Sequence, residues 1–402
     1  MSEAKPEIVS RGRAAEVFTT FLKLGLTSFG GPIAHLGYFR KELVERQNWV
    51  TESQFSQLLA ICQFLPGPAS SQLGFSLGLL RAGWSGAMAA FLAFTLPSAL
   101  LLVGFASMLP LLSGRIGDAV IHGLKLVACA VVADAVLGMF KKLCPDNRRR
   151  GIAVLAAGVL LLSGSAGAQL LVVLAGAAAG VLFCRETAAG SDGHIQVAYG
   201  RRLSAILFAV FLCLLFTLAL APLQSGLFAI AEAFYRAGAL VFGGGHVVLP
   251  LLEESVVTPG WVTKESFLAG YGAAQAIPGP MFAFSAYLGA IIPSGYSAWA
   301  GSMVALVFIF LPGFLLVAAA LPVWQAMSQN PAAANAIAGV NAAVVGVLAA
   351  ALYDPVFTSG ITSGADLAIG IIAFGMLAIW RLSPLFVVLW CVAASLLLVL
   401  VF

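Results

Sequence analysis

Charged residues are scarce in this sequence. They make up 9% of the 402 residues, while 61% are hydrophobic and the mean hydropathy is +1.00. A soluble globular domain has about 25% charged residues, so the composition excludes a soluble protein and gives no reason to expect a nucleic-acid partner. The alternation in segments of about ten residues that marks a membrane β-barrel is also absent. We therefore expect an all-α, polytopic membrane protein embedded in a lipid bilayer.

The motifs of common enzymes and metal sites are missing as well. The six cysteines are scattered, mostly in apolar runs, and form neither a CxxC pair nor a cluster with histidine, so we interpret them as small core residues. No GxxxxGK[ST], GxSxG or HExxH motif occurs. We therefore expect no enzyme, no cofactor and no bound metal. Without a nucleotide site, transport would have to use an ion gradient or the membrane potential.

The most informative motif that is present occurs twice. Gln63–Pro68 reads QFLPGP, and Gln275–Pro280, 212 residues later, reads QAIPGP. Three further pairs follow the same order at spacings of 212 to 215 residues. These are Trp49–Thr51 with Trp261–Thr263, Phe29–Gly31 with Phe242–Gly244, and Pro97 with Pro312. Four ordered pairs indicate an internal duplication.

A Pro-Gly-Pro sequence within an apolar run has a physical cost. Proline lacks a backbone N–H and breaks a helix, and glycine adds backbone freedom. Unpaired backbone groups cost several kcal/mol each in hydrocarbon, so such a break persists only inside the protein or beside a wet cavity. One break in each half of a duplicated membrane protein is typical of a transporter's substrate site. The alternative is that both breaks are kinks that only relieve helix packing.

These motifs resemble those of the chromate ion transporter family in its long, two-domain form. The resemblance rests on Phe-Gly-Gly followed by Gln-x-x-Pro-Gly-Pro in each half, and it covers residues 18–140 and 232–355 well. It implies chromate as the substrate, with sulfate as the isosteric competitor. It also implies export, and hence chromate resistance.

Basic residues predict the topology. Fifteen of the 21 Lys and Arg residues lie at or before Arg150, and Lys141–Arg150 alone holds five. The positive-inside rule places this loop and the N-terminus in the cytoplasm. The loop at 253–265 has one basic residue where its counterpart at 40–52 has three, so it is expected on the opposite side. We therefore predict an inverted-topology repeat with broken or re-entrant helices, in the inner (plasma) membrane.

We divide the chain into a cytoplasmic tail (1–16), a first transporter repeat (17–184), a linker with a connecting helix (185–230) and a second repeat (231–402). We expect roughly 10 to 13 apolar spans, some of them re-entrant. The first Pro-Gly-Pro segment is expected to end at Arg81, and the next to begin at Ser85. The apolar stretch 152–183 is one long span or two short ones, divided at Ser163–Ser165.

The helix that resumes after Pro68 could bind an anion. Its free N–H groups and positive dipole end would point into the break, and Ser70 and Ser71 add hydroxyl donors. The second half has mainly apolar residues there, so the first-half site is expected to contact the anion more. Gln63 and Gln275 could donate amide N–H groups.

The two glycine segments, Gly30-Gly31-Pro32 and Gly243-Gly244-Gly245, could form N–H nests for an anion. His35 and His246 follow them closely. A histidine here could couple protons or supply charge, although a hydrogen-bonded core histidine is an equal alternative. Lys23 and Arg236 occupy equivalent positions, each six residues before its Phe-Gly-Gly, and the alternative for both is snorkelling to headgroups. Lys125 aligns with Asn341 and is either paired across helices or part of an anion path.

The expected substrate-binding residues are Lys23, Gly30, Gly31, Gln63, Pro66, Gly67, Pro68, Ser70, Ser71, Arg236, Gly243, Gly244, Gln275, Pro278, Gly279 and Pro280. A proton or anion path is expected to include His35, Lys125, His246 and Asn341. Expected partners are the oxyanion and the bilayer, with a homodimer compatible with both. An anion channel and a non-transporting scaffold remain the alternatives.

Overall fold

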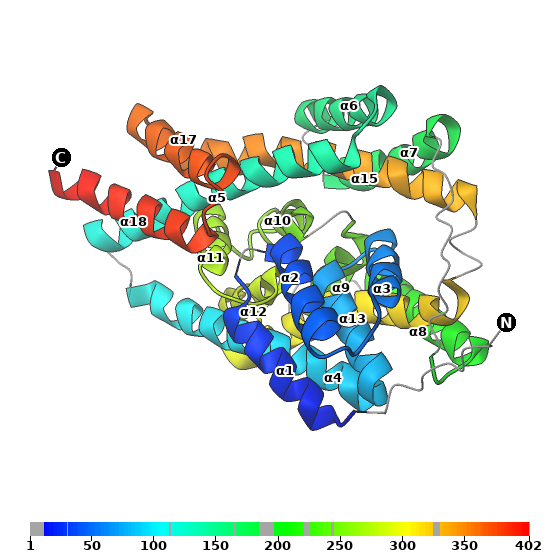
Figure 1. Ribbon diagram of the computed structural model, residues 1–402. Helices are drawn as coiled ribbons and strands as arrows, with labels where there is room; N and C mark the ends of the chain where they lie inside the picture. The colour runs from blue at the N-terminus through cyan, green and yellow to red at the C-terminus, as the bar shows by residue number, and fades with distance from the viewer. Residues whose placement is uncertain are drawn as a thin grey trace.

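The fold is described from a computed structural model that covers residues 12–29, 31–111, 114–163, 166–184, 197–220, 226–242, 245–324 and 330–401. Across these residues the regular structure is helical, with no strand (Figure 1). The all-α prediction is therefore confirmed. The glycines at 30, 243 and 244, the tail before residue 12, and residues 185–196 and 221–225 of the predicted linker lie outside the described residues.

In the described part of the first half and the connecting region there are ten elements, of which η1 is a π-helix and η2 a 3₁₀ turn. They are α1 (Ala14–Thr27), α2 (Gly31–Phe39), η1 (Arg40–Arg46), α3 (Glu52–Phe64), α4 (Ala69–Met108), η2 (Leu109–Leu111), α5 (Arg115–Leu143), α6 (Asn147–Ser163), α7 (Ala166–Phe183) and α8 (Arg201–Leu220). The apolar stretch before residue 184 thus forms two short helices, α6 and α7.

The second half begins at α9, and several of its helices are short. Its elements are α9 (Leu227–Leu240), η3 (Gly245–Val247), α10 (Val248–Val256), α11 (Lys264–Gln275), η4 (Met281–Ala283), α12 (Phe284–Ile291), α13 (Ala298–Ala320), η5 (Leu321–Val323), α15 (Pro331–Ala351), η6 (Leu352–Phe357), α16 (Thr358–Gly360), α17 (Gly364–Ala378) and α18 (Pro384–Val401). Of the irregular elements, η6 is a π-helix and the others are 3₁₀ turns.

Although α4 is continuous by hydrogen bonding, it is a hairpin of two helices. Ala82 and Gly83 have non-helical backbone angles, and Gly83 has φ +69°. The chain therefore folds back, and a Cβ at Gly78 would collide with the Gly86 carbonyl. The predicted boundaries at Arg81 and Ser85 are confirmed. In the second half α12 and α13 form the matching hairpin, because Gly289 and Gly301 make the same backbone contact.

The helix before each Phe-Gly-Gly segment packs closely on the hairpin of its own half. In the first half a Cβ at Gly25 of α1 would lie 2.8 Å from the Phe94 carbonyl of α4. In the second half Gly238 of α9 packs in the same way against the Ile309 carbonyl of α13. Small residues allow helix backbones to approach where lipid provides no hydrophobic drive. The two halves therefore share one local architecture.

Aromatic rings join the hairpins of the two halves. Phe314 of α13 stacks on Phe75 of α4 with ring centroids 4.6 Å apart, and it meets Phe91 edge-on at 4.9 Å. Such pairs add about 0.5–1.5 kcal/mol beyond the area that they bury. The core is thus continuous between the halves.

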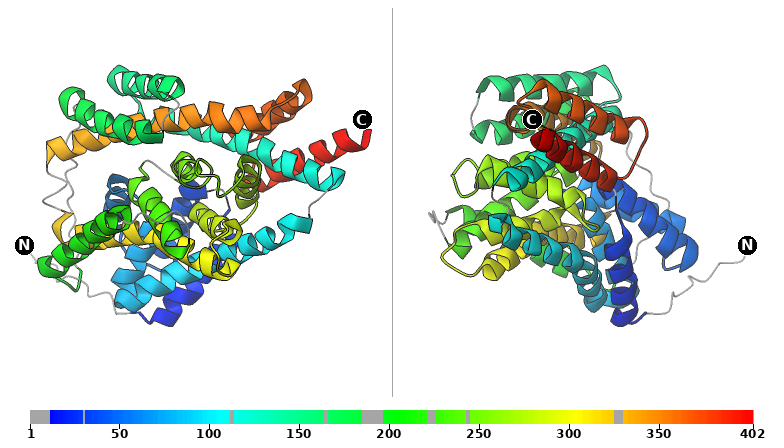
Figure 2. Two further views of the ribbon diagram at one scale, coloured as in Figure 1. Left: turned by 180° about the vertical axis from the view of Figure 1, so that it is seen from behind. Right: turned by 90° about the vertical axis from the view of Figure 1, so that its left-hand side faces the viewer.

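The helices form two layers. In Figure 1, α5, α6, α7, α15 and α17 lie across the top, above the bundle that contains α1–α4 and α8–α13, and the views in Figure 2 agree. In the upper layer, α5 packs on α11, α17 and α18, while α15 packs on α6 and α7. α5 and α15 are equivalent in the repeat, and each packs on the last two helices of the opposite half, so the reciprocal relation between the halves extends into this layer.

Five helical segments of the described chain are long and apolar enough to cross a membrane. They are Ala69–Leu111, Arg115–Leu143, Arg201–Leu218, Ala298–Val323 and Pro331–Gly360. Four shorter apolar helices of 10–17 residues accompany them. This number is smaller than the 10 to 13 spans expected from hydropathy, because several apolar stretches are divided by breaks into helices shorter than a full crossing.

Candidate functional site

The first Pro-Gly-Pro break separates α3 from α4. Thr51 starts α3 with a capping box, accepting from the Gln54 backbone N–H while the Gln54 side chain accepts in return. At the break Gly67 has φ +123°, a conformation that L side chains rarely adopt. Its N–H donates to the carbonyl oxygen of Val241, with 2.7 Å between N and O. Val241 directly precedes the second Phe-Gly-Gly, so the first break binds the glycine segment of the other half.

The second break makes the reciprocal contact. Gly279 has φ +108°, and its N–H donates to the carbonyl oxygen of Ser28 at 3.0 Å. Ser28 directly precedes the first Phe-Gly-Gly. We call these two interactions, Gly67 with Val241 and Gly279 with Ser28, the exchanged hydrogen bonds. A contact in which each half presents the same two surfaces to the other is the pattern of a two-fold relation.

Each break also rests on the proline-containing helix of the opposite half. A Cβ at Gly67 would lie 3.0 Å from the Gly313 Cα, next to Pro312 in α13. A Cβ at Gly279 would lie 2.8 Å from the Ser98 Oγ, next to Pro97 in α4. The structure thus brings together all four proline motifs, at the boundary between the two halves.

Gln72, which the sequence analysis did not select, holds the first break in place. Its Nε2 donates to the carbonyl oxygens of Pro66 and Gly313, each at 3.0 Å. Its buried Oε1 has no hydrogen-bond partner in the described chain. The signal that could have identified it is a glutamine within an apolar run one turn after a break.

The start of α4 carries further polar groups. Its N-cap is Pro68, which makes no side-chain capping bond, so the first amides of the helix lack a side-chain acceptor. Ser70 and Ser71 are both buried, and the Ser71 Oγ has no partner among the residues described. The predicted serines are therefore inside the protein, at the N-terminus of the helix that follows the break.

A second group of buried polar side chains lies around the other break. Ser28, His35 and Thr95 are at most 1% exposed. The Nε2 of His35 lies 3.3 Å from the Ser28 carbonyl oxygen, and its ring packs on Phe94 at 5.3 Å. The Ser28 Oγ, His35 Nδ1 and Thr95 Oγ1 are buried without a partner in the part of the chain that is described. Unsatisfied buried polar atoms are uncommon and call for a structural or functional reason.

Described residues beside the two glycine segments approach each other. Gly31 has φ +74°, and a Cβ there would lie 3.9 Å from the His246 Nε2. On its other side His246 is hydrogen-bonded through Nδ1 to the Tyr271 hydroxyl at 2.8 Å. His246 is thus near the first glycine segment, whereas His35 contacts Ser28 and Phe94 of its own half.

Other predicted residues lie elsewhere. Gln63 and Lys23 are exposed, so neither joins the buried polar groups in this structure. Gln275 is buried and donates to the Tyr271 carbonyl at 3.4 Å. Equivalent repeat positions therefore differ in environment, because the two halves have different neighbours.

Lys125 and Asn341 are also separated from the breaks. Lys125 of α5 lines an open cavity of about 550 Å³ together with Arg115, His122 and Glu265. Asn341 is on α15, and its buried Oδ1 has no partner in the described residues. The alignment of the two positions in the repeat does not bring them to one site.

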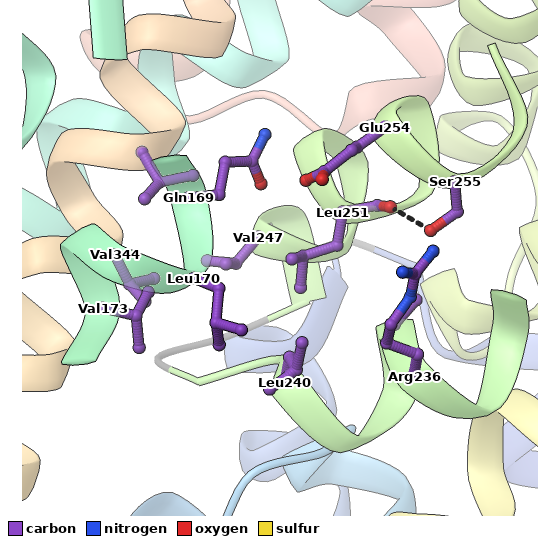
Figure 3. A pocket seen from close by; sticks show the side chains of 12 residues that line it. Gln169, Leu170, Val173, Arg236, Leu240, Val247, Leu251, Glu254, Ser255 and Val344 are labelled. Atoms are coloured by element: carbon purple, nitrogen blue, oxygen red, sulfur yellow. Dashed lines mark hydrogen bonds between the residues drawn. The ribbon is translucent and has the colours of Figure 1, made fainter. Parts of the chain in front are cut away.

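Arg236 lines a different cavity, of about 160 Å³, between α7, α9, α10 and α15 (Figure 3). Its Nε is 3.2 Å from the Glu232 Oε1. Glu254, Gln169 and Ser255 line the same space. This cavity adjoins the second glycine segment, because Leu240 and Val247 from either side of that segment line its wall.

Comparison with known proteins agrees with the duplicated architecture. The sequence profile of the chromate transporter family matches residues 15–181 and 228–396. A probable chromate transport protein of Synechococcus elongatus is 30% identical over 384 residues, covering 93% of each chain. The chromate transport proteins of Pseudomonas aeruginosa and Cupriavidus metallidurans are each 28% identical, covering 84% and 83% of this chain and 80% of their own length.

None of the solved structures matches this chain. The family assignment therefore rests on the profile match over both halves, and the relatives agree with it. With its apolar helices and two broken, mutually bonded halves, the chain belongs to the chromate transporter family of multi-pass membrane proteins.

Proposed function

We propose that this protein is a carrier that exports chromate from the cell, with the oxyanion bound between the two Pro-Gly-Pro breaks. The observation that supports this placement best is the pair of exchanged hydrogen bonds, Gly67 with Val241 and Gly279 with Ser28. They make the boundary between the halves the place where both breaks and both glycine segments meet. A broken helix in each half beside a shared site is the usual construction of a secondary transporter.

The buried donors suit a tetrahedral oxyanion. The hydroxyls of Ser28, Ser71 and Thr95 lack partners in the described structure, and α4 points its N-terminus toward the first break. Helix N-termini and hydroxyls bind oxyanions through N–H and O–H donors. Chromate and sulfate have nearly the same shape and charge, so sulfate is the second candidate substrate.

Alternating access would use the relation between the halves. We propose that the repeats are inverted, with the N-terminus in the cytoplasm and the chain in the plasma membrane. Opening toward one side would separate one exchanged hydrogen bond while the other holds. A buried hydrogen bond contributes about 0.5–1.5 kcal/mol, which is small enough to break during a transport cycle.

Energetics favour export. Moving one charge across 100 mV is worth about 2.3 kcal/mol, so a dianion that leaves a negative cell interior gains about 4.6 kcal/mol per 100 mV. Import would have to carry at least two cations with it.

The test is flux of labelled chromate and sulfate into inside-out vesicles, with and without an interior-positive potential. The carrier predicts saturable uptake that the potential accelerates, together with counterflow. Flux without saturation or counterflow would indicate an anion channel. No flux of either anion, with the protein present in the membrane, would indicate a scaffold and refute the proposal.

A further inference from the structure

Two adjoining cavities share lining residues, and the inner one lies beside the second glycine segment. The inner cavity is the one of about 160 Å³ that contains Arg236, and the outer cavity has about 420 Å³ and lies among α6, α7, α10, α15 and η6. Gln169, Glu254 and Val347 line both. Glu254 therefore stands where the two cavities join.

The charges in these cavities do not suit an oxyanion. Arg236 is paired with Glu232 at 3.2 Å, and Lys264 is paired with Asp354 at 3.5 Å. Each cation is thus neutralised by a carboxylate other than Glu254. For Glu254 itself the described chain offers no ion pair and no side-chain hydrogen bond. A dianion would be repelled here, whereas a proton would relieve the excess negative charge.

Gln169 supplies a matching acceptor. Its Oε1 is buried and lacks a donor among the described residues. Figure 3 shows the Gln169 amide and the Glu254 carboxyl pointing toward one another from α7 and α10. A protonated carboxyl has an O–H to donate, which an ionised one does not. Protonation of Glu254 would thus offer a donor to the unpartnered Gln169 Oε1.

We propose that Glu254 is the proton-binding group that couples oxyanion export to the proton gradient, which rests on the export function proposed above. Protons would arrive through the outer cavity. Glu254 lies on α10, which continues from η3 and the second glycine segment, and Val241 before that segment accepts the hydrogen bond from Gly67. Protonation can thus influence the break through one short stretch of chain.

The titratable groups around Glu254 come from three neighbouring elements. α9 supplies Glu232 and Arg236, the start of α11 supplies Lys264, and η6 supplies Tyr353 and Asp354. Glu253 precedes it on α10 and lines only the outer cavity. The cavity-lining residues of α7 and α15 are not titratable. Burial raises the pKa of Glu254, with Arg236 opposing the rise, which is the direction that favours a bound proton.

The experiment uses the purified full chain in proteoliposomes with the membrane potential held at zero. Chromate–chromate exchange is measured first, and then net chromate movement driven by a pH difference alone. With one proton per chromate, a difference of one pH unit should sustain an approximately tenfold concentration ratio in the wild type. Glu254→Gln should abolish this pH-driven accumulation but retain exchange. The matched control Glu253→Gln should retain both.

The outcomes are distinct. Three results would each overturn the proton site. The first is pH-driven accumulation of chromate by Glu254→Gln, and the second is an equal loss of accumulation in Glu253→Gln. The third is loss of exchange by a Glu254→Gln protein that elutes as folded. Glu254→Asp keeps a carboxyl and should retain coupling with a shifted pH profile, and an unchanged profile would also overturn it. Absence of exchange in the wild type would instead refute the proposed transport function.

Discussion

At the residue scale, the two break glycines are defined by both backbone and space. Gly67 and Gly279 have positive φ, and each would place a Cβ at 3.0 Å or less from an atom of the opposite half. Sequence alone identified both positions, because Pro-Gly-Pro is conspicuous in an apolar run. It could not show that each glycine binds the other half, since such contacts join residues that are far apart in the chain.

We predict that Gly67→Ala and Gly279→Ala each destabilise the protein by about 1–3 kcal/mol, through strained backbone and contact with the other half. Chromate flux should fall sharply in both. Thermal unfolding in detergent and vesicle flux are the measurements. Gly104→Ala in α4, where nothing lies within 4 Å of the added Cβ, is the matched control and should leave both unchanged. Full flux by the Gly67 variant would remove the break from the transport site.

The unpartnered hydroxyls permit a sharper prediction. Ser28→Ala and Thr95→Val each remove a buried group without a partner in the described chain, so stability should be kept or raised by up to about 1–3 kcal/mol. If these hydroxyls bind the oxyanion, chromate affinity should fall roughly tenfold per lost bond. Ser302→Ala is the control, because its Oγ donates to the Ala286 carbonyl at 2.8 Å, and it should lose stability without a change in affinity. Unchanged affinity in both test variants would contradict the role.

Comparison of the two halves did not select Ser28, Thr95 or Gln72, and the reason is physical. Gln72 has Phe284 at its repeat position, so comparison of the halves did not select it. Conversely, Gln63 matched Gln275 and Lys23 matched Arg236, yet Gln63 and Lys23 are exposed. Duplication conserves local chain geometry, but the burial of a side chain depends on which helices of the other half pack against it.

At the element scale, the hairpins explain why the apolar segments outnumber the long helices. The turn at Ala82–Gly83 in α4 and the gap between α12 and α13 each separate a short helical arm from the longer helix that follows it. The sequence analysis placed this turn correctly, between Arg81 and Ser85. The packing of α6 and α7 on α15 was not predictable, because it joins helices of opposite halves, as the close contact of Gly123 in α5 with Val392 in α18 also does.

We expect the glycines of the two hairpins to be equally intolerant of substitution. In Gly78→Ala and Gly289→Ala the added Cβ would collide with a backbone carbonyl, so each should cost about 1–3 kcal/mol. Thermal unfolding in detergent measures this loss of stability. Gly138→Ala in α5 has open space at its Cβ and should be neutral. A large loss at one hairpin glycine and none at the other would show that the hairpins are not equivalent.

The start of α6 allows a prediction about pH. The Asp146 carboxylate accepts from the backbone N–H groups of Arg148 and Arg149 and from the Arg149 Nε, and these bonds lower its pKa. Because the folded pKa is lowered, the stabilisation is present above the ordinary value of 3.8 and disappears as the pH falls through the folded value. Asp146→Ala should cost about 0.5–1 kcal/mol at neutral pH, since the group is exposed. The difference in Tm from the wild type should shrink in acid, and a constant difference would exclude the charge as its origin.

At the scale of the whole molecule, the exchanged hydrogen bonds relate the halves to each other but not to the membrane. A two-fold axis in the membrane plane gives inverted halves, whereas an axis along the membrane normal gives parallel ones. The distribution of basic residues favours the first arrangement, because the loop at 40–46 is basic and its counterpart near 253–264 is acidic.

Glu45 and Thr258 test this directly, since they are exposed and 213 residues apart at equivalent positions of the repeat. In a Cys213→Ala background, which removes the exposed cysteine of the described chain, Glu45→Cys and Thr258→Cys would be labelled separately with a membrane-impermeant maleimide. Inverted halves predict that right-side-out vesicles label only Thr258→Cys and inside-out vesicles only Glu45→Cys. The five remaining native cysteines are buried, so the parent protein should stay unlabelled in both preparations. Labelling of both positions from one side would make the halves parallel, and the two breaks could then not open alternately to opposite sides by the motion proposed.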